Sequence, residues 1–527
     1  MEMKKKSQWS WKQFIICFVV SMGTMGFSYP ASIIGTTLAQ PSFLVYMSLL
    51  TPEGAFTDQG NSLIGAMSGV FQAGGVFGIL GVTIVMDKWG RKAGMWFCAT
   101  LGLVGGALTC AAQGVAMFIA VRFLSGAGAW GFLSITPVYT AEIAPPALRG
   151  LFVGMNGIGI ALGYAIATYI GLGFFYSSNP QLQWRGSYGI ALIFSLLPLV
   201  AMFFVPESPR WLLMVNRVDD AKKTVRQLHN LDNEEEQHFA MAEFYQMQKQ
   251  IEYDRTVEPS WIKMFTRKSY RARLVMTCTY SFLAQATGIL VINNYGPILY
   301  ATLGFDGEKQ LIYACGWITM GIGGNLMGAL IIDKIGRKPL MLIGIGGCLL
   351  FLTLEAAMVA SFASPVSDPP NRRGIEAAIA FLYLFVFTFG MGVDVSGFVF
   401  YGEIFPNHIR SKGMAITVTT FCLSSLIWLQ VAPTAFANIG WKFYLVFICI
   451  LAVGLVFISL ILPETKGIPL EEIAVIFGDQ DEVVIFSEDL AVGDSPEDLV
   501  VRNHAAGEGE NDTAEKASEL HHETVRL

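Results

Sequence analysis

Charged residues occur in two matched sets, one in each half of the sequence. MDKWGRK, from Met86, matches IDKIGRK, from Ile332, and YTAEIAPPALRG, from Tyr139, matches YGEIFPNHIRSKG, from Tyr401. PESPR, from Pro206, matches PETKG, and the two members of each match lie about 250 residues apart. Carboxylate and guanidinium groups in such sets can form ion pairs between neighbouring helices. The charged members are Asp87, Arg91, Glu142, Arg149, Glu207 and Arg210 in the first half and Asp333, Arg337, Glu403, Arg410 and Glu464 in the second.

Other kinds of site chemistry have little support in the sequence. No GxSxG, Walker or HExxH pattern occurs, so the sequence offers no nucleophile elbow, phosphate-binding loop or zinc-binding histidine pair. The eight cysteines form no CxxC pair, and of the six histidines only His521 and His522 are neighbours, whereas a metal site needs clustered ligands. The sequence therefore predicts no enzyme, no metal site and no cofactor.

The helices that must position the charged sets are predicted to span a membrane. The chain is 53% hydrophobic and 14% charged, against roughly a quarter charged in a soluble domain. Its apolar residues fall in runs of about 20 or more, the length that crosses a bilayer core. We therefore predict an all-α integral membrane protein with twelve transmembrane helices. The runs are 11–35, 62–86, 93–113, 115–138, 151–175, 187–205, 274–300, 310–332, 339–360, 375–401, 413–437 and 441–462.

These runs divide the chain into regions. A polar stretch, 206–273, separates a six-helix half, 12–205, from a second, 274–462, leaving an N-terminal segment, 1–11, and an acidic tail, 463–527. Lys and Arg accumulate in short cytoplasmic loops, and here they precede the first run and follow the second and eighth. We expect both termini, the central stretch and the charged sets to be cytoplasmic, and the tail to be disordered.

The motifs together resemble those of the sugar porter family within the major facilitator superfamily, and filamentous-fungal members in particular. RFLSGAG, from Arg122, joins the matched motifs, and all occur in the family's order along nearly the whole membrane portion. The resemblance implies a major facilitator fold, in which two parallel six-helix halves hold a substrate between them and transport it by alternating access.

In such a fold the charged sets would lie at cytoplasmic helix ends. Ion pairs that form when this end is closed must break when it opens, so we predict that the sets act as a gate. The alternative is that they only set topology and cap helices, because exposed ion pairs contribute little.

The resemblance also locates positions at which family members bind sugar. The family's QQxxGxN pattern reads AQATGIL here and retains Gln285, its YY pair reads Asn294 and Tyr295, and its GPxPW element reads DVSGF. A typical glucose site is therefore not expected. Amides within a membrane need partners, which are either a substrate or other helices, and phenylalanines either stack on a substrate or pack. The predicted substrate-binding residues are Gln285, Asn293, Asn294, Asn156, Asn325, Phe389, Phe398 and Asp394.

Two ionisable residues, Arg122 and Asp394, lie well inside apolar runs. Exposure to lipid there costs about 2.5–3.5 kcal/mol, so both are predicted to face the interior. The resemblance implies that Arg122 pairs with a first-helix aspartate in proton-coupled members, yet GTMGFSYPASIIG has no acid. This favours facilitated diffusion over proton symport, unless Asp394 is a relocated proton site; Asp394 could instead contact substrate or bond locally. Glu355 is expected at the outward membrane interface.

Three functions stay open. The chain could carry a sugar or sugar-like polyol, carry or export another metabolite such as a quinate-like acid or a pathway product, or act as a nutrient sensor with a transporter fold. We expect a monomer in the lipid bilayer, most often the plasma membrane in this family. Its partners would be a small-molecule substrate and, under symport, protons, with no nucleic acid.

Overall fold

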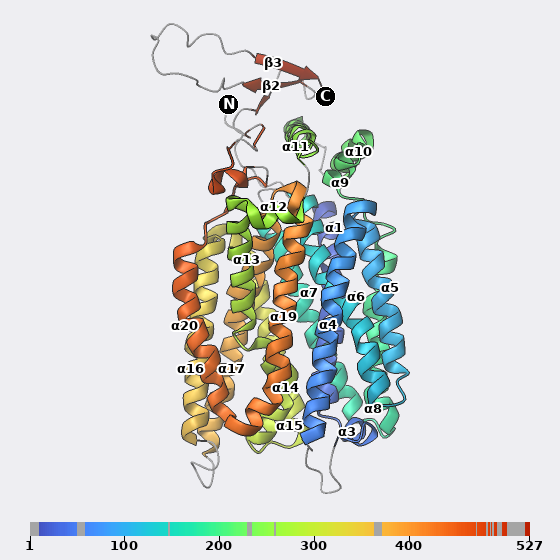
Figure 1. The fold of residues 1–527 in the computed structure, drawn as a ribbon, viewed down its shortest axis with the longest axis vertical. Helices are drawn as coiled ribbons and strands as arrows, with labels where there is room; N and C mark the ends of the chain where they lie inside the picture. The colour runs from blue at the N-terminus through green and yellow to red at the C-terminus, as the bar shows by residue number, and fades with distance from the viewer. Residues whose placement is uncertain are drawn as a thin grey trace.

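The chain folds into a bundle of long helices that carries shorter helices at one end (Figure 1). The computed structural model describes the following residues, to which every structural statement below refers: 10–49, 58–145, 148–228, 234–257, 260–362, 371–470, 472–480, 483–484, 486, 490–492, 498–502 and 522–526. Most of the predicted N-terminal segment, residues 1–9, lies outside them.

Apolar runs become helices because backbone polar groups in lipid must bond within their own segment. In the first half, one crossing consists of α1, a short 3-10 turn η1, and α2, which contains Pro30. The elements of this half are α1 (Trp11–Ser21), η1 (Met22–Thr24), α2 (Met25–Thr37), α3 (Pro41–Tyr46), α4 (Asp58–Trp89), α5 (Arg91–Cys110), α6 (Val115–Ile143), α7 (Arg149–Phe175) and α8 (Pro180–Ala201).

The second half contains two irregular crossings. Its first crossing is broken between α13 and α14, where Gly288 has a φ of 82°, a left-handed conformation that favours glycine. Another contains a π-helical turn, η3, a feature that is frequent at functional sites. The elements are α13 (Lys268–Gln285), α14 (Ile289–Thr302), α15 (Gly307–Ile335), α16 (Arg337–Phe362), α17 (Arg372–Thr388), η3 (Phe389–Asp394), α18 (Val395–Glu403), α19 (Asn407–Ile439), η4 (Gly440–Lys442) and α20 (Phe443–Ile461).

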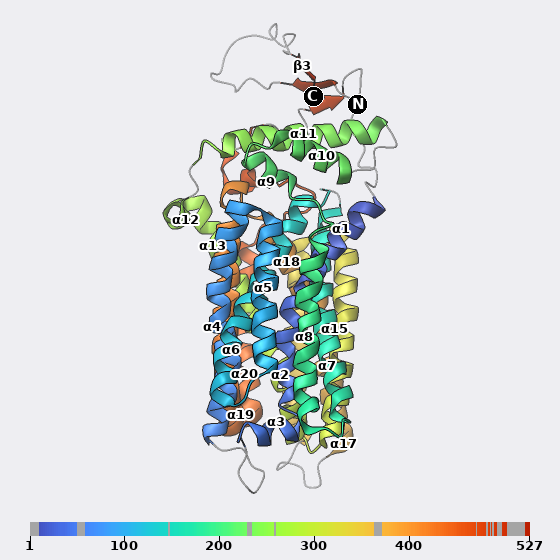
Figure 2. The same ribbon diagram turned by 90° about the vertical axis from the view of Figure 1, so that its right-hand side faces the viewer.

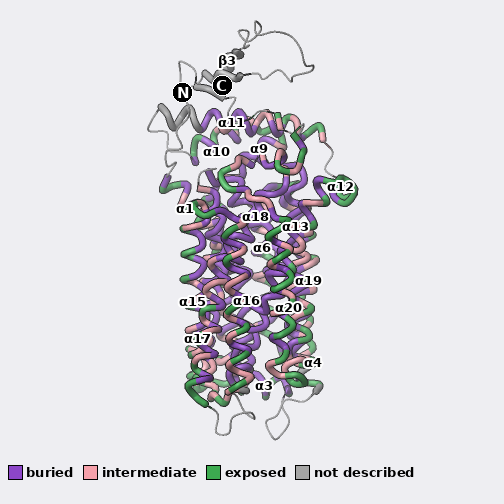
Figure 3. Tube along the Cα trace, turned by 90° about the vertical axis from the view of Figure 1, so that its left-hand side faces the viewer, coloured by how far each residue is buried: buried purple, intermediate pink, exposed green. Residues whose placement is uncertain are grey.

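The described residues contain eleven stretches that are long and apolar enough to cross a membrane. The last of them, Asn407–Ile461, is a hairpin of α19 and α20, which reverses direction at Gly440. The crossing helices therefore number the predicted twelve. Exposed residues lie along the length of the bundle (Figure 3). Many of them are large and apolar, among them Val453 and Leu460, which are 74% and 78% exposed. Such a surface suits lipid, because it would be unfavourable in water.

Short helices from the predicted central stretch cover one end of the bundle (Figure 2). They have their own apolar core, which includes Trp211, Val225, Phe244 and Ile251. We call this end the motif end, because the matched charged residues lie there, and the other the opposite end. The short helices are α9 (Pro209–Met214), α10 (Val218–Leu228), α11 (Glu234–Asp254) and α12 (Trp261–Thr266).

Part of the predicted tail is ordered against the motif end. A 3-10 turn, η5 (Ile473–Phe477), is held by Asp479, whose carboxylate accepts hydrogen bonds from Arg267 at 2.9 Å and Arg273 at 3.0 Å. Further along, three strands form an antiparallel sheet in the order β1-β2-β3, with Leu490 opposite Val501 and Asp498 opposite Arg526. The strands are β1 (Leu490–Val492), β2 (Asp498–Arg502) and β3 (His522–Arg526).

Candidate substrate pocket and gate

Arg91 and Glu142 form a bidentate ion pair at the motif end of the first half. The Nη2 and Nε atoms of Arg91 donate to Oε1 and Oε2 of Glu142 at 2.6 and 2.8 Å, and each side chain is 2% exposed. Ser208 Oγ donates to Glu142 Oε2 at 2.5 Å, and Arg210 Nη1 donates to the Glu142 carbonyl at 3.1 Å. Such added hydrogen bonds help to offset the desolvation of a buried pair. The network joins α5, α6 and α9.

Glu207 lies at the N-terminus of α5. Its carboxylate accepts hydrogen bonds from the backbone amides of Arg91 at 3.0 Å, Lys92 at 3.2 Å and Ser208 at 2.9 Å. Unsatisfied amides and the helix dipole favour an anion at this position. Burial raises the pKa of the Glu207 carboxyl, while these amides and Arg91 oppose the shift. At Gly90, φ is 101° and an added Cβ would lie 2.4 Å from Glu207, so the turn requires glycine.

The second half repeats this arrangement. Arg337 Nη2 and Nε donate to Oε1 and Oε2 of Glu403 at 2.8 and 3.2 Å, and Thr465 Oγ1 donates to Glu403 at 2.9 Å. Glu464 accepts from the amides of Arg337 at 2.9 Å and Lys338 at 3.0 Å, as Glu207 does in the first half. The sequence repeat is therefore a repeat of side-chain geometry.

Two aspartates, not the bidentate ion pairs, form hydrogen bonds between the halves. Asp333 Oδ2 accepts from the amide of Leu151 at 2.8 Å, at the start of α7. Asp87 Oδ2 accepts from Ser411 Oγ at 2.8 Å, near the start of α19. Separation of the halves at the motif end would break both bonds, while each ion pair could stay intact within its own half.

Two buried arginines add contacts between the halves at the same end. Arg149 Nη1 donates to the carbonyl of Ile468, beyond the last crossing, at 3.4 Å. Arg410 Nε donates to the carbonyl of Phe405 at 3.2 Å, and Arg410 is close enough to Glu142 for electrostatic attraction. All of the predicted gate residues therefore lie together at the motif end.

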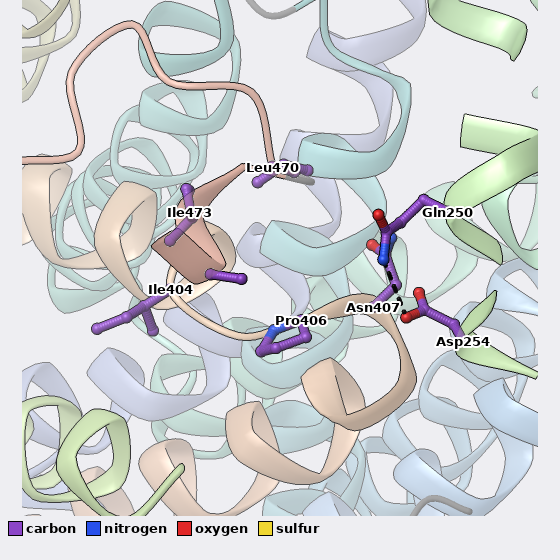
Figure 4. Close-up of a pocket in the computed structure, with 8 residues that line it drawn as sticks. Gln250, Asp254, Ile404, Pro406, Asn407, Leu470 and Ile473 are labelled. Carbon is purple, nitrogen blue, oxygen red and sulfur yellow. Dashed lines mark hydrogen bonds between the residues drawn. The ribbon is translucent and has the colours of Figure 1, made fainter. Parts of the chain in front are cut away.

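A small pocket at the motif end marks where α11 and the tail meet the second half (Figure 4). Gln250 and Asp254 of α11 line it beside Pro406 and Asn407, and Leu470, Ile473 and Ala474 close it from the tail. Asp254 Oδ1 accepts from Gln250 Nε2 at 3.4 Å and lies 3.2 Å from His408 Nδ1. The short helices α9 to α12, which we call the cap, and the tail thus cover the motif end while the two halves are in contact.

A second pocket lies between the halves toward the opposite end. Asn293 on α14 donates through Nδ2 to Ser32 Oγ on α2 at 3.4 Å, which joins the halves across the pocket. The remaining space has room for about one water molecule, so a substrate would enter only after the helices separate. The lining residues are Ser32, Gly35, Thr36, Thr168, Ile292, Asn293, Gly296, Pro297, Tyr300, Ala314 and Trp317.

Of the eight predicted substrate-binding residues, Asn293 lines this pocket. Gln285 is buried at the break between α13 and α14, where Oε1 accepts from Ser425 Oγ at 2.9 Å and Nε2 has no partner among the described residues. Asn294 is buried with an unpartnered Oδ1, and its carbonyl packs against Gly35. Each amide keeps unused hydrogen-bonding capacity near the broken helix.

Another group of predicted residues meets where α15 and η3 pack on α7. Asn325 hydrogen-bonds with Asp394, and its Nδ2 donates to the Gly321 carbonyl at 3.1 Å. Asn156 is buried on α7, where its Nδ2 donates to the Val153 carbonyl at 2.8 Å. The bonds to Gly321 and Val153 link each asparagine to its own helix, whereas the bond to Asp394 joins α15 to η3. Oδ1 of each asparagine has no partner among the described residues.

The two predicted phenylalanines, Phe389 and Phe398, are buried near the π-helical turn. Phe398 packs edge-on against Tyr401, with ring centroids 6.5 Å apart. Neither ring belongs to the lining of the pocket between the halves.

Arg122 is buried in α6 at 1% exposure. Its Nη1 donates to the Pro30 carbonyl at 2.9 Å and its Nε to the Met67 carbonyl at 3.3 Å, and the guanidinium lies 4.3 Å from the centroid of Phe71. Among the described residues, no carboxylate forms an ion pair with it. Within the described part of the first half, this positive charge is therefore in contact with carbonyls and an aromatic ring and forms no ion pair with a carboxylate.

The model of the family described as "Sugar (and other) transporter" matches residues 16–477. The chain belongs to this family. It is 30% identical over 464 residues to the MFS-type transporter criB of Aspergillus cristatus, covering 87% of this chain and 91% of that protein. It is 28% identical over 491 residues to a probable quinate permease of Aspergillus fumigatus, an alignment that covers 90% of this chain and 88% of that protein. It is also 28% identical over 487 residues to a quinate permease of Neurospora terricola, covering 88% of this chain and 89% of that protein. The predicted resemblance to fungal transporters is confirmed.

Solved structures confirm the major facilitator fold of this transporter. The proton:xylose symporter XylE bound to 6-bromo-6-deoxy-D-glucose superposes with a TM-score of 0.76 at 23% identity, over 88% of this chain and 99% of that one. XylE from E. coli in an inward-open conformation superposes with a TM-score of 0.63 at 22% identity, over 88% of this chain and 99% of that one.

Several lining residues of this transporter were missed in the sequence. Trp317 on α15 contributes an aromatic face and an indole N–H without a partner among the described residues, and Ser32, Thr36 and Thr168 contribute hydroxyls. An aromatic residue within the GWITMG stretch of the eighth run was the available signal for Trp317. The hydroxyl residues had none, because Ser and Thr are common in membrane helices and bond to their own backbone.

Proposed function

We propose that this transporter carries a small polyhydroxylated organic acid of the quinate class by alternating access, with its motif end and both termini in the cytoplasm and the plasma membrane as its site. This favours the carrier of a non-sugar metabolite over the sugar carrier that the family resemblance implies. The observation that carries the proposal is the buried Arg122, which has no acidic partner among the described residues.

A cation within the membrane is energetically costly, so a buried arginine in a crossing helix indicates a functional site. Arg122 holds the carbonyl of Pro30, two residues before Ser32, which lines the pocket between the halves. Pro30 and Ser32 lie on different faces of α2, so Arg122 and the pocket are on different sides of this helix. Attraction between the Arg122 charge and an anion in the pocket would act across α2, where a low dielectric constant weakens it less than water does. A neutral sugar would gain nothing from the same charge.

The hydroxyl groups of such a substrate also find suitable partners. Ser32, Thr36 and Asn293 offer donors and acceptors on one side of the pocket, and Trp317 offers an indole N–H and an apolar face. Substrates with hydroxyls on one face and C–H groups on the other fit a pocket that has polar groups on one side and an aromatic ring on the other. Asp394 with Asn325 is a further candidate contact once the cavity opens.

The relatives support the same substrate class. Two of the relatives described above are named as quinate permeases, and the similarity covers most of both chains. The substitutions at the family's sugar-binding positions, such as Phe398 where the family has tryptophan, agree with a substrate other than a hexose.

A sugar or sugar-like polyol is the second candidate. Gln285 is retained at a family sugar contact, and its free Nε2 lies at the helix break. Neutral polyols would bond to the same hydroxyl-binding residues, and the charge of Arg122 would not contribute to their binding.

Uptake in transporter-deficient yeast cells separates the two candidates. Labelled quinate, hexoses, pentoses and disaccharides are compared for wild type, Arg122→Gln and Arg122→Lys. We expect quinate uptake that is lost in Arg122→Gln and partly kept in Arg122→Lys, which retains the charge. Hexose uptake without quinate uptake, or quinate uptake unchanged in a well-expressed Arg122→Gln variant, would contradict the proposal.

A further inference from the structure

Glu355 is a carboxylic acid buried inside the second half. It lies on α16, seven residues before the helix ends at Phe362, which places it roughly 10 Å inside the opposite end. The sequence places it at the membrane interface, yet its exposed fraction is 2%. The helices that pack around α16 enclose the side chain instead.

The surroundings of Glu355 are tyrosines and apolar groups. Tyr444 on α20 hydrogen-bonds with the carboxyl, and Tyr300 on α14 lies close enough for an electrostatic interaction. The Oε2 atom has no partner, and no Lys, Arg or His of the described residues forms an ion pair with Glu355. A buried carboxylate without a cation costs far more than a buried neutral acid, so the closed conformation favours the group with its proton bound.

Tyr300 connects this acid to the pocket between the halves. Its side chain lines the pocket, and it packs on Tyr313, with ring centroids 5.7 Å apart, whose carbonyl accepts from Tyr383 at 2.8 Å. Tyr300 lies near the end of α14, the helix that follows the break at Gly288. Tyr300 is therefore a neighbour of both the pocket and Glu355.

We propose that Glu355 is a proton-binding site of the transport cycle, reached from the pocket past Tyr300, and that the carrier moves one proton with its substrate. The proton comes from water in the open pocket, is held as Glu355–COOH while the halves are closed, and returns to water when the pocket opens to the other compartment. This inference rests on the proposed function, because a proton is needed as a counter-charge only if the transported substrate is an anion.

Charge balance gives the physical reason. Moving one anion into a cell against an inside-negative potential costs about 2.3 kcal/mol per 100 mV, and a proton moved with it cancels that charge. Arg122 cannot take part, because a guanidinium stays protonated. Asp394 is the rival site, since it is also an acid within a crossing and interacts electrostatically with Tyr164, Tyr280 and Tyr401.

The first experiment uses the full chain in liposomes with labelled quinate. A gradient of about one pH unit limits electroneutral accumulation to about tenfold for one proton per substrate. Wild type is expected to accumulate quinate several-fold, whereas Glu355→Gln, a neutral isostere of the acid, is expected to reach an accumulation ratio close to unity and to retain quinate exchange. Thr353→Ala, an exposed change on the same helix, serves as the matched control.

Asp394→Asn separates the rival site. Under our proposal, quinate accumulation by this variant falls only as much as its rate of quinate exchange falls. Retained accumulation in Glu355→Gln, or selective loss of accumulation in Asp394→Asn with exchange intact, overturns the proposal.

A second measurement needs no substrate. Infrared difference spectra of the reconstituted protein across a pH jump should contain a protonated-carboxyl band that disappears in Glu355→Gln and shifts in Tyr300→Phe. If wild type exchanges no quinate but this band is present, the proposed substrate is wrong and the proton site stands. If the band is unchanged in Glu355→Gln, the proton site is wrong, whatever the substrate.

Discussion

The repeated ion pairs of the motif end and the residues around the pocket between the halves differ in how their polar groups are satisfied. At the motif end, Arg91 with Glu142 and Arg337 with Glu403 are fully paired in a geometry that both halves repeat. Around the pocket, Asn294 and Trp317 keep buried atoms without partners among the described residues, and no repeat relates them. Contacts that close one end of a transporter reproducibly need fully paired polar groups. A binding site instead needs polar atoms that have no protein partner and can bond to the substrate.

The largest expected effect tests the pairing at the motif end. Removing one partner of a buried ion pair leaves an uncompensated charge, which costs about 3–5 kcal/mol. We expect Arg91→Ala and Arg337→Ala to lower the thermal stability of the detergent-solubilised protein by similar amounts. Lys334→Ala, an exposed change at the same end, should have no such effect. Markedly unequal losses would mean that the two halves do not share one design.

The bonds between the halves should have a smaller and more specific effect. Asp333→Asn weakens a charge-assisted hydrogen bond to the amide of Leu151, and such bonds contribute about 1.5–3 kcal/mol. Asparagine also weakens the ion pair of Asp333 with Arg337 Nη1 at 3.0 Å, although Glu403 still pairs with that arginine. We therefore expect a shift toward an open motif end, measured as a longer distance between spin labels at positions 88 and 334, with a smaller loss of stability than in Arg337→Ala. Asp220→Asn, in the exposed part of the cap, is the control. An unchanged distance distribution would remove the gating role of Asp333.

Changes in the pocket should alter substrate affinity and leave the fold intact. Trp317→Phe keeps an aromatic ring but removes the indole N–H, a loss of about 0.5–1.5 kcal/mol if this group bonds to substrate. The KM for transport should rise roughly 2–10-fold, with the amount of folded protein unchanged. Trp261→Phe, on α12 outside the bundle, should leave KM unaffected. An unaltered KM in Trp317→Phe would indicate that the indole only packs.

The smallest effect is expected at Ser32. Its bond to Asn293 is long, at 3.4 Å, so Ser32→Ala should cost less than about 1 kcal/mol in the closed state. Substrate affinity should change less than about fivefold, as measured by competition with unlabelled substrate. Asn293→Ala should have the larger effect, because it removes a donor and an acceptor. The reverse order would place the substrate on the α2 side of the pocket.

Much of the fold could be predicted because it depends on local patterns. Runs of apolar residues give the crossings, and the spacing of MDKWGRK and IDKIGRK gives the two halves. The location of the predicted gate residues at one end could be predicted for the same reason, since their charges stand out in an apolar chain. The sequence did not indicate that Asp87 and Asp333, and not the paired arginines, form the bonds between halves. That distinction depends on how the two halves dock.

The pocket was harder to predict, because its residues come from distant helices. Asn293 was predicted as an amide within a membrane helix, next to the family's YY position, but Trp317 and Ser32 meet it only through the packing of α14, α15 and α2. Glu355 shows the same limit. A position near a helix end suggested exposure at the interface, whereas Tyr300 and Tyr444 from other helices enclose it.

The sequence by itself determined that this is a twelve-helix transporter with repeated halves, because lipid allows few solutions for long apolar runs and because the charged motifs are explicit. It also determined that Arg122 has no acid on the first helix. Only the tertiary structure decided which polar groups are paired and which are left free, including the unpaired Oε2 of Glu355. Partners within a membrane protein are set by which helix faces meet, and that information does not reside in any one helix.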